Sequence, residues 1–278
     1  MKTFKFYAMA AIMTMCSCEK FTTESAKTGE SKEQNVELQL SREEAVKKAC
    51  QKVSFAFFKE DEKVGIINQG ADDKDFGSIH LSLSPGTYRV IAIGHNGTGN
   101  CTITSPEKVT FTSNKVTDTF YYYGDLESKE GEKISETITL KRAVAMLRLV
   151  IKDEIPARAK KIKFYYTGGS STFNPVTGFG CVNSKQTETL NITPNQQVYE
   201  VYTFPHDDGR KLQVTISVLD ENDFTIASTT LTDVSVTKNY ITKVSGKLFK
   251  EISGEGTGDI SIDLEFDPEW AGETEYEF

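Results

Sequence analysis

Cys18 is the residue with the clearest chemical potential. It ends the stretch Met13-Thr14-Met15-Cys16-Ser17-Cys18, which follows Lys2, Lys5 and the uncharged apolar run of residues 6–15. A positive start, an apolar run and a small residue before the cleavage point are typical of a signal peptide. A cysteine directly after that point indicates the lipoprotein type, in which the new N-terminal cysteine carries acyl chains on its sulfur and its amine.

The predicted lipoprotein signal peptide covers residues 1–17, and Cys18 is the predicted lipidation site. Two alternatives remain, an ordinary secretory leader cut nearby and acylation of Cys16. The apolar run is about half of the ~20 residues that a membrane-spanning helix needs, so we expect no spanning helix there.

Candidate catalytic or metal-ligating residues lie too far apart to form a recognisable motif. The histidines have no paired spacing for zinc, and the acidic loop of residues 72–75 lacks the glycine and final glutamate of an EF-hand. No nucleophile, base and orienting group can be assembled from the motifs. We therefore expect no enzyme activity, no metal and no cofactor. The three histidines are His80, His95 and His206.

The composition is acidic. The chain has 278 residues, 40 acidic and 32 basic, and a formal net charge of −8. Loss of residues 1–17 would remove two lysines and make the net charge −10. An acidic surface repels phosphate backbones, so nucleic acid is excluded as an expected partner. Cys50, Cys101 and Cys181 form no disulfide framework, and at most one bridge beside a free thiol could form.

The predicted body begins after a polar segment. Residues 18–35 contain almost nothing to bury, which predicts a flexible tether. Residues 36–40 alternate apolar and polar, as a strand with one buried face does. Ser41 and Glu44 then form a capping-box pattern before one short helix.

The rest of the chain reads as β-strands with recurring turns, which predicts an all-β fold of two sandwich domains, residues 36–140 and 141–278. Residues 76–83 and 88–93 are expected to pair as a hairpin around Ser84-Pro85-Gly86. Residues 144–151 could be a helix by length, but the flanking strands and Pro156 favour a buried strand. The other strands expected in the second domain are 161–167, 198–204, 212–219, 224–231, 240–249 and 260–266, with hairpin turns at 207–209 and 220–223.

Aromatic residues supply the remaining candidates for a contact site. On a strand, side chains alternate between the two faces, as those of Tyr121, Tyr122 and Tyr123 would. At least one ring should therefore be partly exposed to solvent and could contact a partner or a glycan. The alternative is that the rings cover a sheet edge. Trp270 is expected to hold the last strand onto the second domain, and residues 273–278 to be mobile or open to a partner strand.

Three stretches resemble the FimB and Mfa-type fimbrial lipoproteins of Bacteroidota. They are residues 140–147 (LKRAVAML), 238–249 (KNYITKVSGKLF) and 83–88 (LSPGTY). The resemblance covers most of the chain after the leader. It implies two tandem transthyretin-like β-sandwich domains. It also implies a lipid-anchored, surface-exposed outer-membrane protein that is an anchor, stalk or tip subunit of a fimbria, with no enzymatic role.

The resemblance also implies how such subunits join. A strand from one subunit completes the sheet of the next, and in stalk subunits a protease cutting after an arginine first removes the original strand. Arg42 is the candidate for that cut, although it could simply face solvent in the first turn of the helix. We expect a base anchor, held to the outer membrane by acyl chains and bound to other fimbrial subunits. The alternatives are a stalk or tip subunit and a surface lipoprotein that captures a glycan or a host protein.

Overall fold

The structure is a computed structural model that describes residues 34–41, 43–249, 270 and 272–277. These residues are almost entirely β, which confirms the predicted fold class. The elements are β1 (Val36–Leu40), α1 (Glu43–Ala49), β2 (Lys52–Lys59), β3 (Glu62–Gly70), β4 (Ser78–Leu81), β5 (Gly86–His95), β6 (Thr102–Ser105), β7 (Lys108–Thr110), the 3-10 turn η1 (Thr112–Asn114), β8 (Thr119–Ser128), β9 (Ile134–Ile138), β10 (Lys141–Arg142), β11 (Ala145–Ile151), β12 (Lys161–Thr167), β13 (Phe173–Asn174), β14 (Phe179–Gly180), β15 (Gln186–Asn191), β16 (Val198–Thr203), β17 (Leu212–Leu219), β18 (Thr225–Val234), β19 (Tyr240–Gly246) and β20 (Gly272–Glu277).

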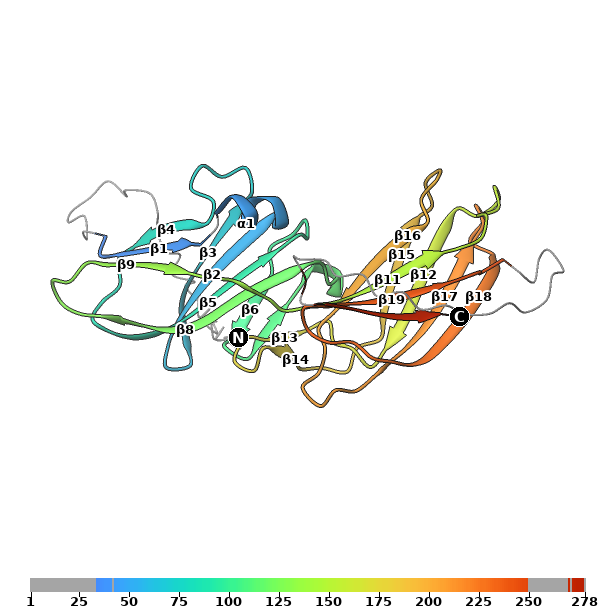
Figure 1. Ribbon diagram of the computed structural model, residues 1–278. Helices are drawn as coiled ribbons and strands as arrows, with labels where there is room; N and C mark the ends of the chain where they lie inside the picture. Colours follow the sequence, from blue (N-terminus) through green and yellow to red (C-terminus); the bar gives the residue numbers. More distant parts are fainter. Residues whose placement is uncertain (1–33, 42, 250–269, 271, 278) are drawn as a thin grey trace, which may run out of the picture.

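The N-terminal half is a sandwich of two sheets, drawn in blue to green in Figure 1. One sheet has the order β4-β1-β9 and the other the order β10-β8-β5-β2-β3. Apolar side chains from both sheets form one buried core, to which Val46 and Ala49 of α1 add a partly buried edge. The helix follows from its sequence, because these two residues lie three apart and share one helical face.

The C-terminal half is a second sandwich, with sheets β16-β11-β19-β20 and β15-β12-β17-β18. Its own core contains alternate residues of the facing strands. The segment that could have been a helix is strand β11, between antiparallel β16 and parallel β19. Burial on both faces explains its continuous apolar run, because Leu147 and Leu149 enter this core whereas Met146 enters a different one.

A third core joins the two halves. It combines Ile91 and Ile93 from the first sandwich with Phe204 and Ile241 from the second. A small sheet of order β14-β13-β7-β6 lies beside it and contains strands from both sides of residue 140. The division into domains 36–140 and 141–278 therefore stays a prediction, since the two halves share both a core and a sheet.

Arg142 is the polar centre of this junction. Its Nε and Nη2 donate to the two carboxylate oxygens of Asp118 at 2.9 and 3.0 Å, and its Nη1 donates to Asn239 Oδ1 at 3.2 Å. The guanidinium carbon lies 3.8 Å from the ring centroid of Trp270 and 4.7 Å from that of Phe120. Trp270 is itself buried in the shared core, so it packs between the halves and not on the second sandwich alone.

The predicted hairpin of residues 76–83 and 88–93 is wrong. Strand β4 pairs with β1, whereas β5 lies between β2 and β8 in the opposite sheet. The Ser84-Pro85-Gly86 turn therefore passes the chain from one sheet to the other. The sequence pattern indicated both strands, but it carries no information about which strand lies next to each.

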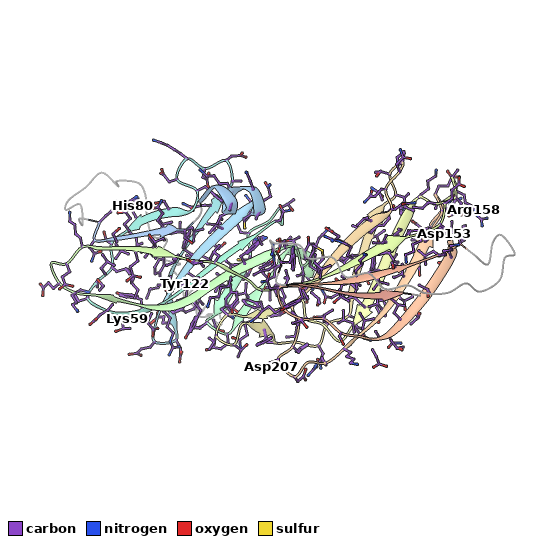
Figure 2. The ribbon with its side chains drawn as sticks, viewed as in Figure 1. Lys59, His80, Tyr122, Asp153, Arg158 and Asp207 are labelled. Atoms are coloured by element: carbon purple, nitrogen blue, oxygen red, sulfur yellow. The ribbon has the colours of Figure 1, made fainter. Side chains whose placement is uncertain are left out.

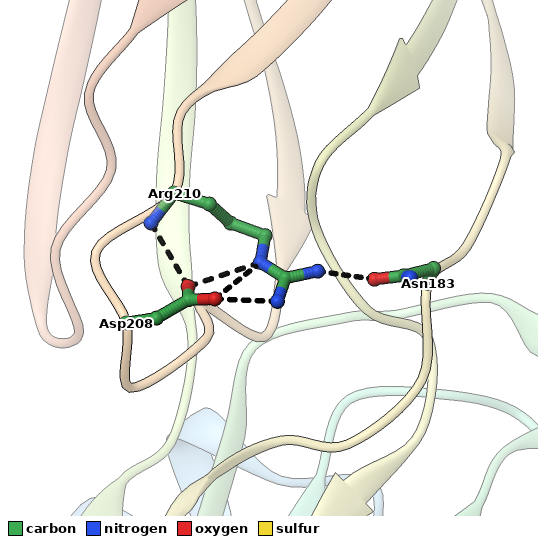
Figure 3. Close-up of polar contacts among 3 residues, drawn as sticks. All are labelled: Asn183, Asp208 and Arg210. Carbon is green, nitrogen blue, oxygen red and sulfur yellow. Dashed lines mark hydrogen bonds and ion pairs between the residues drawn. The ribbon is translucent and has the colours of Figure 1, made fainter.

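The predicted hairpin turn at residues 207–209 is also wrong. It connects β16 of one sheet to β17 of the other, and Figure 3 shows how it is held. Asp208 accepts hydrogen bonds from the backbone N–H and the guanidinium of Arg210, which also donates to Asn183 Oδ1. These bonds lower the pKa of Asp208 to about 2. The other turn, residues 220–223, does join the antiparallel neighbours β17 and β18, as predicted.

Candidate assembly site

Strand β1 occupies the middle of its sheet. It pairs antiparallel with β4, with Leu38 opposite Ile79, and parallel with β9, with Leu38 opposite Glu136. Both neighbours lie far from β1 in the sequence, because 37 residues separate Leu40 from Ser78. Strand β1 is therefore held mainly by long-range contacts, although it is the first element of the described chain.

The buried face of β1 is formed by its three aliphatic side chains. Val36, Leu38 and Leu40 are 2%, 1% and 1% exposed and belong to the core of the first sandwich. Burial of such a side chain contributes about 1.5–3 kcal/mol to stability. The alternation in the sequence predicted this face correctly, and Gln39 between them is exposed.

Side chains fix both ends of β1. Asn35 Nδ2 donates to the Leu83 carbonyl at 2.9 Å, and the Leu83 N–H donates to Asn35 Oδ1 at 2.8 Å. At the other end the Ser41 N–H donates to the Ile138 carbonyl at 2.8 Å, and the Ser41 and Thr139 hydroxyls lie 2.9 Å apart. The role of Asn35 escaped the sequence reasoning, which placed it last in the tether. A polar residue directly before an alternating strand was the available signal.

The two residues predicted to act in processing, Cys18 and Arg42, both lie outside the described residues. Arg42 lies in the sequence between Ser41, whose N–H is hydrogen-bonded to Ile138, and Glu43, the first residue of α1. Lipidation at Cys18 and cleavage at Arg42 therefore stay predictions.

Tyr121, Tyr122 and Tyr123 alternate across β8, as expected. Tyr122, labelled in Figure 2, packs against the core of the first sandwich, whereas Tyr121 and Tyr123 pack against the shared core. The Tyr121 ring makes an edge contact with Phe173 at 4.8 Å, and Lys238 Nζ lies 5.8 Å from its centroid. Burial raises the pKa of Tyr121 and of Tyr122. All three rings are only half-buried, and their contact with a partner or glycan stays a prediction.

Strand β20 shows that residues 273–277 are not the mobile tail that was one expectation, whereas the other expectation, a segment open to a partner strand, stays a prediction. The strand pairs parallel with β19 from Tyr240↔Gly272 to Ser245↔Glu277 and forms an edge of its sheet. The predicted strand at residues 260–266 lies outside the described residues.

The histidines and cysteines are dispersed in the structure as well. His95 is 2% exposed, and burial, with a smaller contribution from Lys52, lowers its pKa to about 4. Burial also raises the pKa of Cys50 to about 12 and that of Cys101 to about 11, so both thiols stay protonated. The cysteines of the described chain form no disulfide, and its His, Cys, Asp and Glu side chains make no metal-binding cluster. None of the helices in the described ranges is long and apolar enough to cross a membrane.

Solved structures of other proteins are similar to this chain to different degrees. A candidate adhesin from Bacteroides ovatus ATCC 8483 has a TM-score of 0.50 and 13% identity, covering 91% of this chain and 99% of that one. The fimbrial anchor protein Mfa2 from Porphyromonas gingivalis has a TM-score of 0.37 and 12% identity, covering 70% of this chain and 80% of that one. At such identities the first likeness shows a common fold. A comparison with curated protein sequences finds no match.

A sequence profile of a family of unknown function, DUF6562, matches residues 98–278, which include the end of the first sandwich and all of the second. The chain therefore belongs to this family.

Proposed function

We propose that this protein is a lipid-anchored subunit of a surface fimbria, located at the outer membrane and acting at the base of the fibre. Three features support the proposal: the lipoprotein-type leader, the polar tether and a body made of β-sandwiches. Its role is structural and not enzymatic: it holds the fibre and contacts other subunits. The resemblance of residues 83–88, 140–147 and 238–249 to fimbrial lipoproteins supports it.

The observation that carries the proposal is the insertion of β1 between β4 and β9. Neighbouring strands lie about 4.8 Å apart, so removal of β1 would leave β4 and β9 separated by about 10 Å. The exposed groove would contain unpaired backbone groups and the apolar side chains of Ile79, Leu81 and Ile138, which belong to the same core. A strand from another subunit with alternating apolar residues would pair with these backbone groups and cover these apolar side chains.

The peptide bond after Arg42 would then decide the role of the subunit. With this bond intact, β1 stays in its sheet and the chain remains joined through residues 18–35 to the acylated Cys18. Each buried methylene contributes about 0.8 kcal/mol to membrane binding, and two or more acyl chains give a durable anchor. Cleavage after Arg42 would release the body from its lipid and make β1 removable, as a stalk subunit requires.

Mass spectrometry of the mature N-terminus from cells tests the proposal. An acylated Cys18 is the expected result, and a chain that begins at Glu43 would instead support the cleaved stalk subunit. An unmodified start near Ala26 would contradict both. If cleavage is found, R42Q should abolish it, whereas R89Q, which changes an arginine on the surface of β5, should not.

Deletion of the gene separates the anchor from a protein that only binds ligands. Loss of a base anchor should release fimbriae into the medium or change their length. Attached fimbriae of normal length would contradict the proposal and would leave the alternative, capture of a glycan or host protein through residues such as Tyr121–Tyr123.

A further inference from the structure

The outer face of the sheet β15-β12-β17-β18 has an ordered polar surface. Along β12, Ile162, Phe164 and Tyr166 point into the core of the second sandwich. Because side chains alternate across a strand, Lys161, Lys163 and Tyr165 occupy the opposite face. Tyr165 is 39% exposed.

The register of the sheet places Lys163 and Tyr165 between threonine and serine residues of the neighbouring strands, and Lys161 between Asn191 and Leu219. Strand β15 supplies partners on one side of β12, and strand β17, itself paired with β18, supplies partners on the other. The resulting cross-strand rows are Thr187–Tyr165–Thr215–Thr230, Thr189–Lys163–Ser217–Ser228 and Asn191–Lys161–Leu219–Thr225.

Side chains of all three rows, together with Asp223, line a hollow of about 710 Å³. At its margin the hydroxyls of Thr215 and Thr230 lie 3.1 Å apart, as do those of Ser217 and Ser228. Each hydroxyl can donate and accept, so these pairs retain capacity for a further hydrogen bond to a ligand. The hollow thus presents hydroxyl groups, two amines and one aromatic ring within a single sheet face.

The charged residues that line the hollow carry a net positive charge, opposite in sign to that of the whole protein. The charged residues that line the hollow are Lys161, Lys163 and Asp223. Lys161 forms an ion pair with Asp223 at 2.6 Å, whereas no ion pair joins Lys163 to a carboxylate in the part of the chain that the structure describes. The exposed ammonium of Lys163 therefore lies in the middle row of a locally positive face on a chain of net charge −8.

We propose that this face binds an acidic polysaccharide. Lys163, supported by Lys161, would pair with a carboxylate or sulfate group through charge-assisted hydrogen bonds. The Tyr165 ring, next to Lys163 along the same face of the strand, would pack against a sugar ring, because a tyrosine offers an apolar face and a polar tip. The threonine and serine hydroxyls would bond to those of the sugar.

This site is distinct from the assembly site. The sheet that contains β12 and β17 and the sheet that contains β1 lie at opposite ends of the molecule in Figure 1. Glycan binding here does not depend on the fimbrial proposal, and it assigns no contact to Tyr121, Tyr122 or Tyr123, whose rings are engaged with the cores.

Binding of the folded protein to polygalacturonate and to chondroitin sulfate, with neutral dextran as the comparison, tests the proposal. We expect at least one acidic polymer to bind, and dextran to bind at least about tenfold more weakly. K163Q should weaken binding about tenfold, the loss expected from one charge-assisted hydrogen bond. Y165T, which keeps a residue that favours strands, should weaken it about fivefold or more.

Two variants serve as matched controls. K74Q removes an exposed lysine elsewhere, and Y240T removes a tyrosine that is 36% exposed on another sheet. Both should bind within about twofold of the wild type, and all four variants should keep its melting temperature. Failure of both acidic polymers to bind, equal binding to dextran, or equal losses in the control variants would overturn the proposal. So would binding to phosphatidylglycerol vesicles without binding to either polysaccharide.

Discussion

The first and last strands of the described chain are alike in one respect and opposite in another. Strand β1 runs parallel to β9 and strand β20 runs parallel to β19, so each terminus adds a parallel strand to a mostly antiparallel sandwich. Strand β1, however, lies between two strands, whereas β20 lies at an edge. The backbone hydrogen-bonding groups of β1 are therefore paired on both sides, whereas among the described residues those on one side of β20 have no partner strand.

The difference indicates which terminus the fold depends on. Removal of a central strand opens two hydrogen-bonded ladders and the core beneath them, and removal of an edge strand opens one ladder. The N-terminal strand is therefore structurally essential until another strand replaces it. The C-terminal strand could be displaced at lower cost, or could template a further strand on its open side.

A pair of truncations tests this comparison most directly. A chain that begins at Glu43 lacks β1 and three buried aliphatic side chains, so we expect a loss of more than about 5 kcal/mol in the free energy of unfolding. A chain that ends at Ala271 keeps Trp270 but lacks β20. Its free energy of unfolding should fall by clearly less. Urea denaturation of both measures the losses, and an equal or larger loss without β20 would break the comparison.

A single substitution within β1 tests how much its buried side chains contribute to stability. Leu38 is 1% exposed, and L38A should cost about 2–5 kcal/mol because it leaves a cavity in the core. Q39A, at the next and exposed position of the strand, should change stability by no more than about 0.5 kcal/mol. Similar losses from the two variants, again by urea denaturation, would show that β1 is not packed as described.

Acidification should destabilise the protein through His95, which lies in neither terminal strand. His95 has a pKa of about 4 in the folded protein against 6.5 ordinarily, so the unfolded chain binds more protons between these values. Stability should fall as the pH drops through this window, by up to about 3 kcal/mol from this residue.

The H95N variant isolates that contribution, since its amide oxygen can replace the Nδ1 atom that accepts the Gly97 N–H. Urea denaturation at pH 7 and pH 4 should show a larger loss for the wild type than for H95N. Because His95 contacts Phe111 of the shared core, the protection factors for hydrogen exchange should be lower at pH 4 than at pH 7 in both β1 and β20. An identical pH dependence of the two proteins would contradict this account.

The smallest effect concerns the hydrogen bonds between the Asn35 side chain and the Leu83 backbone at the start of β1. N35A removes both side-chain hydrogen bonds to Leu83 and should cost about 1–2 kcal/mol. Q34A, one residue earlier and exposed, is the matched control and should cost less than about 0.5 kcal/mol. Denaturation curves that do not separate these variants would show that β1 is held by its strand ladders alone.

Local patterns predicted the elements of this fold well. The alternation of residues 36–40 gave β1 and its buried face, and the capping-box pattern that begins at Ser41 correctly predicted α1. The strand expected at 161–167 has the same bounds as β12. Strand β3 was missed because residues 62–70 contain glycine, asparagine and charged residues with little alternation. Strand β15 was missed because Gln186–Asn191 is almost wholly polar.

Pairing between strands was predicted less well than the strands themselves. Two turns that appeared to close hairpins instead carry the chain between sheets, because a period of two specifies a face and not a partner. The candidate site shows the same limit. Sequence identified β1 and the residues beside it, but the insertion between β4 and β9 depends on contacts with segments about 40 and 100 residues away. The rows around Tyr165 likewise exist only through the register of four strands.

The shared core has a mechanical consequence. The residues that connect the two sandwiches, Ala143 and Val144, are both 0% exposed, so the molecule has no solvated linker at its middle. Rotation of one half against the other would expose these residues to water and separate the stacked rings of Phe111 and Phe204, which come from different halves. The protein should therefore transmit torque and tension as one stiff body. In the fibre proposed above, bending would be confined to the joints between subunits.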